Sequence, residues 1–157
     1  MDNLKRVLVV CRLTGSCGPV VRAAADQART FGAELYVAHI IHDPFGIEGW
    51  NLPLPSLEKD LSRLLEKTRK DMDQLVAEEK REGMAVKELI REGKPVEEIE
   101  KIVRDEKIDL LVLPAHEESR LEHFLFGKDN EDLIRRMPCS ILLVKWEAKP
   151  APYPWPA

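Results

Sequence analysis

Several features that would assign a function class are missing from this chain of 157 residues. No stretch approaches the roughly 20 consecutive apolar residues that a membrane-spanning helix needs. The N-terminal segment has none of the anatomy of a signal peptide. A net charge of −4 provides no general attraction to nucleic acid or to an anionic membrane. We therefore expect a small soluble domain with neither nucleic acid nor a membrane as partner.

Cysteine is scarce as well. The chain has 3 cysteines, and an odd number without a CxxC motif is typical of a reducing compartment rather than a disulfide framework. This composition predicts a cytoplasmic protein.

Catalytic motifs are also lacking. The sequence has no Ser-His-Asp order, no dinucleotide-binding glycine fingerprint and no Walker loop. His116 and His123 are about 10 Å apart if they lie on one helix, which is too far for a single metal ion without further ligands. We expect no catalytic activity of its own and no metal.

What the chain does contain is a regular alternation of two patterns. Compact apolar runs predict five strands, at 6–11, 34–41, 85–91, 108–113 and 140–146. Between them, apolar residues at helical spacing predict helices, each with one buried stripe. Turn chemistry fills 14–19, and the proline-rich and glycine-rich segment 42–55 reads as a loop. Strands alternating with helices predict a parallel sheet covered on both faces.

The helical periodicity predicts which side chains are buried. The first helix presents Val20, Val21, Ala24, Ala25, Ala28 and Phe31. The second and longest, from Ser56 to a stop at Gly83, presents Leu57, Leu61, Leu64, Leu65, Met72, Leu75 and Val76. A third opens at the Gly93-Lys94-Pro95 turn and presents Val96, Ile99, Ile102 and Val103. A short last helix at 131–137 turns Leu133 and Ile134 inward.

Two longer stretches carry a family resemblance. "REGKPVEEIEKIVRDEKIDLLVL" and "GKDNEDLIRRMPCSILLV" resemble the universal stress protein family, and the likeness covers roughly residues 4–146. It implies an α/β, Rossmann-like fold of the adenine nucleotide alpha hydrolase-like kind. That fold is a single open five-stranded parallel sheet of order 3-2-1-4-5, with helices on both faces. We expect a domain at 1–146 and a proline-rich tail at 147–157.

The same resemblance implies a ligand crevice between the first and fourth strands, at their carboxyl ends. ATP-binding members carry Gly-x2-Gly-x9-Gly-Ser/Thr there, because glycines let backbone N–H groups wrap around phosphates. In this chain the pattern falls on Pro114, Glu117, Gly127 and Lys128, and only Gly127 keeps it. Pro114 lacks an N–H, and Glu117 brings a carboxylate toward the phosphates. We expect no ATP binding in the usual manner and no cofactor, with ATP and AMP disfavoured.

Two alternatives stay open. In ATP-binding relatives an aspartate ends the first strand, whereas Arg12 stands nearest that position here. A rewired anion or nucleotide site would use Arg12, Lys128 and the turn Thr14–Gly18. A weaker alternative is thiol redox chemistry at Cys17, where the start of a helix lowers a thiol pKa.

Association is predicted from the last strand, which lies at a sheet edge in this topology. A fully apolar exposed edge invites pairing with another chain, and the resemblance implies a two-fold dimer. The expected interface residues are Ile141, Leu142, Leu143, Val144 and Trp146.

The loop at 42–55 is unusually apolar. Phe45, Ile47, Trp50, Leu52 and Leu54 lie within it. It therefore reads either as a lid over the sheet end or as a surface for a protein partner.

Overall fold

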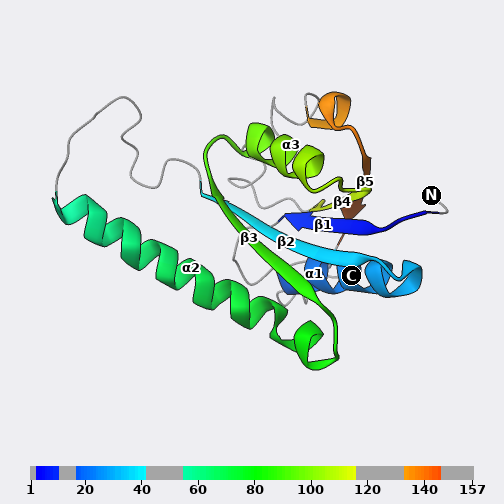
Figure 1. Ribbon diagram of the computed structural model, residues 1–157, viewed down its shortest axis with the longest axis horizontal. Helices are drawn as coiled ribbons and strands as arrows, with labels where there is room; N and C mark the ends of the chain where they lie inside the picture. Colours follow the sequence, from blue (N-terminus) through cyan, green and yellow to red (C-terminus); the bar gives the residue numbers. More distant parts are fainter. Residues whose placement is uncertain (1–2, 11–16, 42–54, 116–132, 146–157) are drawn as a thin grey trace, which may run out of the picture.

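The computed structural model describes residues 3–10, 17–41, 55–115 and 133–145, with side chains from residue 58 onward in the second helix. Its strands are β1 (Arg6–Val10), β2 (Glu34–Ile41), β3 (Val86–Glu92), β4 (Leu110–Pro114) and β5 (Ser140–Val144). Its helices are α1 (Cys17–Phe31), α2 (Pro55–Arg81) and α3 (Pro95–Asp105), and residues 133–136 add a single helical turn (Figure 1).

The five strands form one parallel sheet of order β3-β2-β1-β4-β5. This confirms the predicted fold class and strand order. β1 lies at the centre, where it pairs with β2 along its whole length and with β4 from Val7 to Val9. From β1 the chain adds β2 and β3 on one side and then β4 and β5 on the other. The strand order therefore reverses between β1 and β4.

Alternate residues of β1 enter two different cores. Val7 and Val9 pack with α1 and with Val76 of α2 on one face of the sheet. Leu8 and Val10 pack with α3 on the other. Figure 1 shows the same division, with α1 and α2 on one side of the sheet and α3 on the opposite side. Both faces of a parallel sheet must be covered, and the short apolar runs seen in the sequence follow from that double burial.

The predicted helical stripes are largely confirmed. In α1 the buried residues are Cys17, Val20, Val21, Ala24, Ala25 and Ala28, and in α3 they are Pro95, Ile99, Ile102 and Val103. α1 ends as expected before Gly32, whose φ of 65° places it in the left-handed region that suits glycine.

The strand ends differ from the prediction by up to two residues: β4 begins at Leu110 instead of 108, and β5 ends at Val144 instead of 146. Three further details of the prediction are wrong. Residues 17–19 belong to α1 and not to a turn; Pro19 is tolerated because N–H groups in a first helical turn have no intrahelical partner. Phe31 is 44% exposed, since it is the last residue of the helix. Ile134 is 53% exposed, because in one helical turn the inward face is taken by Leu133 and Met137, four residues apart.

The two edges of the sheet differ in chemistry. β3 carries Lys87, Glu88, Arg91 and Glu92 among its seven residues, whereas β5 reads Ser-Ile-Leu-Leu-Val. Within the described ranges, no helix has the length and apolar composition to cross a membrane.

Substitution of the fully buried Leu111 on β4 tests the double-sided core. We expect Leu111→Ala to lower the free energy of unfolding by about 2–5 kcal/mol, because it leaves a cavity. Ile134→Ala, at an exposed site, is the control and should change it by less than about 1 kcal/mol. Urea denaturation measures both. Equal losses in the two variants would contradict the assignment of Ile134 to the surface.

Candidate functional site

The candidate site is the carboxyl edge of the sheet at the junction of β1 and β4. Parallel α/β sheets bind ligands where the strand order reverses, and here β1 ends at Val10 beside β4, which ends at Pro114. Among the residues predicted to line this crevice, Pro114 is described. The others, Arg12, Thr14, Glu117, Gly127 and Lys128, lie outside the described residues.

Pro114 continues the β4–β5 ladder instead of starting a free loop. It is in register with Val144, and the next residue, Ala115, donates its N–H to the Val144 carbonyl at 2.8 Å. Proline itself has no N–H. The first two positions after the buried part of β4 therefore present no free backbone donor to an anion.

The start of α1 is the second element at this edge. Helix N-termini attract anions through unpaired N–H groups and the helix dipole, and the first turn of α1 contains no acidic residue. Its first residue, Cys17, is only 2% exposed and belongs to the core beneath the sheet. Thiol reactivity needs access as well as a lowered pKa, so this burial argues against the redox interpretation of Cys17.

Gly93 closes the outer part of the carboxyl edge, between β3 and α3. Its N–H donates to the Ile41 carbonyl at 3.0 Å, and its φ of 143° favours glycine. The Glu98 side chain lies against Gly93, at 3.0 Å from where a Cβ would stand. Glu98 also pairs with Lys101 at 2.8 Å. The predicted turn before Pro95 is thereby confirmed and held in place.

A charged cluster fixes the segment that precedes β5. The largely buried carboxylate of Glu100 on α3 pairs with Arg104 at 2.8 Å through one oxygen. Its other oxygen pairs with Arg136 of the turn 133–136 at 3.0 Å. Because both oxygens are used, the carboxylate links the turn to α3 and sets where β5 begins.

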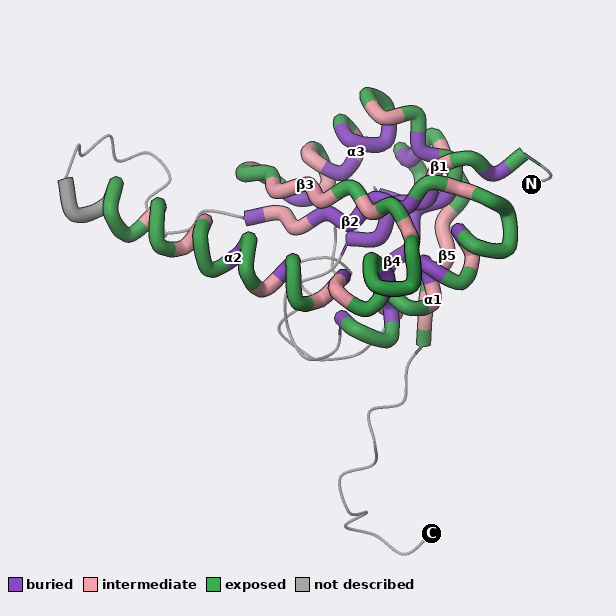
Figure 2. Tube along the Cα trace, turned by 60° about the horizontal axis from the view of Figure 1, so that its bottom comes forward, coloured by how far each residue is buried: buried purple, intermediate pink, exposed green. Residues whose placement is uncertain are grey.

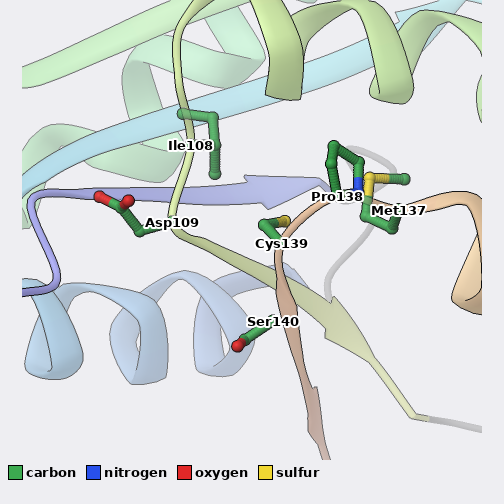
Figure 3. A pocket seen from close by; sticks show the side chains of 6 residues that line it. All are labelled: Ile108, Asp109, Met137, Pro138, Cys139 and Ser140. Carbon is green, nitrogen blue, oxygen red and sulfur yellow. The ribbon is translucent and has the colours of Figure 1, made fainter.

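A hollow of about 500 Å³ lies at the opposite end of the sheet, among Ile108, Asp109, Met137, Pro138, Cys139 and Ser140 (Figure 3). Asp109 turns toward the start of β1, where one carboxylate oxygen accepts the N–H groups of Lys5 and Arg6 at 2.9 Å each. This carboxylate therefore has a structural task in holding β1. The sequence offered no signal for it, since its partners lie about a hundred residues away.

Cys139 borders the same hollow and is half-buried. Burial raises the pKa of its thiol from 9.0 to about 11, opposed in part by a hydrogen bond from the Leu111 backbone and assisted by the charge of Asp109. A thiol of this kind stays protonated at neutral pH and is a poor nucleophile.

A polar relay at the amino ends of β1, β2 and β3 was also not predicted. Lys87 donates to the Tyr36 hydroxyl, which donates to Glu34, each at 3.1 Å. The hydrogen bond from Tyr36, followed by the charge of Lys87, lowers the pKa of Glu34. The hydrogen bond to Tyr36 raises the pKa of Lys87, so its amine stays charged. The relay satisfies the polar end of a buried tyrosine and points to no catalytic base.

A family model described as the universal stress protein family matches residues 3–145, nearly the whole chain. The chain belongs to the universal stress protein family. Universal stress protein MJ0531 of Methanocaldococcus jannaschii is 32% identical over 127 residues, which are 78% of this chain and 71% of the relative. Universal stress protein MJ0577 of the same organism is 32% identical over 101 residues, or 64% of this chain and 62% of the relative's length.

Solved structures of other universal stress proteins share the fold. The structure of MJ0577 superposes with a TM-score of 0.72 at 23% identity, covering 92% of this chain and 98% of that chain. A universal stress protein from Archaeoglobus fulgidus, solved in complex with dAMP, superposes with a TM-score of 0.60 at 19% identity, covering 91% and 98%. At these identities the likeness establishes the fold.

Metal chemistry finds no support in the part of the chain that the structure describes. No group of three or more His, Cys, Asp or Glu side chains there is placed to hold an ion. His116 and His123 lie outside the described residues.

Alkylation of Cys139 tests its raised pKa. In a Cys11→Ala/Cys17→Ala variant, a thiol of pKa about 11 is only about 0.1% thiolate at pH 8. We expect iodoacetamide labelling of the folded protein to be slow and to accelerate with a midpoint near pH 11. In denaturant the midpoint should fall toward 9. A native midpoint at or below 9 would contradict the burial of this thiol.

Proposed function

We propose that this universal stress protein is a cytoplasmic, non-catalytic, dimeric interaction module that does not bind ATP in the manner usual for its family. The observation that carries the proposal is the continuation of the β4–β5 ladder through Pro114 and Ala115. A phosphate loop requires free N–H groups close to the ligand. The first of these two positions has no N–H, and the second gives its own to β5.

The sequence of the following loop supports the same conclusion. Glu117 stands where a second glycine is expected and Lys128 where a hydroxyl residue is expected. A carboxylate near the phosphates of ATP is repelled by them. The crevice therefore keeps the scaffold of a nucleotide site while the groups that would hold a triphosphate have changed.

A nucleotide or anion sensor is the second candidate, because the universal stress protein from Archaeoglobus fulgidus was solved in complex with dAMP. The described part of the crevice supports it at one point, the α1 N-terminus without acidic residues in its first turn. Arg12, Thr14 and Lys128 would supply the remaining contacts. A monophosphate needs fewer donors than a triphosphate, so the two candidates differ in ligand preference.

Calorimetric titration with ATP, AMP and cAMP separates the two candidates. For the interaction module we expect no binding of ATP tighter than about 1 mM. A Pro114→Gly/Glu117→Gly/Lys128→Ser variant restores the glycines and the hydroxyl, and it should bind ATP at least about tenfold more tightly than the wild type. Pro138→Gly, which removes a proline from the opposite end of the sheet, is the control and should leave binding unchanged.

Each possible outcome decides between the candidates. Micromolar ATP binding by the wild type would remove the main support for the proposal. Binding of AMP or cAMP without ATP would favour the sensor. A restored variant that folds but gains no affinity would show that Pro114, Glu117 and Lys128 are not what limits nucleotide binding.

The dimer is proposed to form through β5. Among the described residues β5 pairs with β4 alone, and its side chains are apolar after Ser140, with Leu143 45% exposed. The Val144 carbonyl pairs with β4, and backbone groups alternate in direction along a strand. The N–H and C=O of Ile141 and Leu143 therefore point outward, ready for a second strand. Trp146 and residues 42–54 of the loop proposed as the partner surface lie outside the described residues. Pro55, predicted as the end of that loop, is instead the first residue of α2.

Leu143→Pro tests this interface by removing a single backbone donor. It removes an outward N–H while leaving the inward ladder to β4 in place, as proline is tolerated at sheet edges. We expect the wild type to be dimeric at micromolar concentration and Leu143→Pro to shift toward monomer, as measured by size exclusion with light scattering. Leu143→Ala, which keeps the N–H, should remain largely dimeric. A monomeric wild type would rule out the proposed dimer.

A further inference from the structure

α2 is much longer than the sheet that it covers. Its 27 residues span about 40 Å at 1.5 Å per residue, whereas the 7 residues of β3 span about 23 Å. The two elements are joined by a short turn at residues 82–85. The excess therefore falls at the N-terminal end of α2, which runs out past the carboxyl ends of β2 and β3 (Figure 1). We call residues 58–67 the arm.

The two halves of α2 are attached differently. In the C-terminal half, Arg22 and Arg29 of α1 pair with Glu78 and Glu82, and Lys80 pairs with Glu88 of β3. That half buries Thr68, Met72, Val76 and Glu79 completely or nearly so. Among the described residues, no ion pair is formed by the charged side chains of the arm.

The arm nevertheless carries an apolar stripe. Leu61, Leu64 and Leu65 are half-buried, and every other residue of the arm is exposed, as the pink and green pattern along α2 in Figure 2 shows. Leu61 and Leu64 followed by Thr68 are spaced three and four residues apart. This is the a and d spacing of a coiled coil.

Two residues of opposite charge, Asp60 and Lys67, flank this stripe on the same side, seven residues apart. If Leu61 occupies position a and Leu64 position d, Asp60 and Lys67 occupy the two g positions. When two such helices pack antiparallel with Leu61 against Leu64, the g position of one lies beside the g position of the other. Asp60 of each copy then faces Lys67 of the other copy.

We propose that the arm is a self-association surface, and that arms from two copies of this chain pair antiparallel through Leu61 and Leu64. Two Asp60–Lys67 pairs flank that seam. A parallel arrangement would set Asp60 beside Leu65 of the second copy and gain no opposite-charge pair. The charge pattern therefore selects both the partner, a second copy, and its direction.

The arrangement is favoured because the helix exists before association. A peptide of this length would spend most of the association energy on forming a helix. The arm is the first part of a longer helix that α1 and β3 already hold. An interface of about three turns lies at the weak end of the range for specific contacts.

This surface is distinct from the proposed β5 dimer, since α2 packs on β3 at the other edge of the sheet. Two isologous interfaces on one chain link dimers into closed tetramers or longer chains. A weak arm contact is reinforced when β5 has already paired two chains, because two arms then act together.

Charge reversal tests the arm by sedimentation velocity over a range of concentrations, in the Leu143→Pro background so that β5 pairing does not contribute. We expect Asp60→Lys and Lys67→Asp each to weaken self-association by about tenfold or more, since each replaces two attractive pairs with two repulsive ones. An equimolar mixture of the two variants should associate as well as the parent, because both opposite-charge pairs are then restored between unlike chains.

Lys59→Glu is the matched control. Lys59 is an exposed charge of the same arm at position f, on the side away from the seam, and its reversal should leave association unchanged. Equal association of all the variants, or a mixture no stronger than the single variants, would overturn the proposal. A parent that stays monomeric at the highest concentration would do so as well. None of these results bears on β5, because all of them are obtained in the Leu143→Pro background, in which that interface is disrupted.

Discussion

The structure depends on one constraint, the burial of β1 on both faces. Val7, Leu8 and Val9 have no exposed surface, and a strand in that position has to be covered by helices on each side and by strands at each edge. α1 and α3 therefore lie on opposite faces, while β2 and β4 occupy the two flanks. All the strand ends that matter for binding then meet at one edge, and β3 and β5 are left as the outer strands.

The two outer strands differ in how many charged residues they carry. β3 has four charged residues among its seven, and α2 packs on one of its faces, so pairing with another strand there would bring charges together. β5 has no charge between Ile141 and Val144. The sheet thus has one charged outer strand and one apolar outer strand. At the carboxyl end of β4, Pro114 and Ala115 leave no backbone N–H free.

Most of the fold was predictable because hydrophobic periodicity reports burial directly. The run at 34–41 predicted β2 residue for residue, and the Gly93-Lys94-Pro95 turn predicted the start of α3. Errors arose where periodicity says little. Ile134 lies in a single helical turn, too short to define a face. The partners of Asp109 and Glu100 come from segments distant in the chain, which local patterns cannot reveal. In the candidate site, the aligned motif predicted that Pro114 stands at the first glycine position. The hydrogen bond from the Ala115 N–H to β5 could not be predicted, because its acceptor lies 29 residues further along the chain.

The contact between Asp109 and the start of β1 has a consequence for biosynthesis. The carboxylate holds the N–H groups of residues that precede it by 104 and 103 positions. At roughly 5–20 residues per second of translation, β4 follows β1 out of the ribosome after a delay on the order of ten seconds. During that delay β1 has β2 as a neighbour on one flank and nothing on the other. The β1–β4 pairing therefore has to wait for the second half of the domain, which makes it one of the late contacts to form.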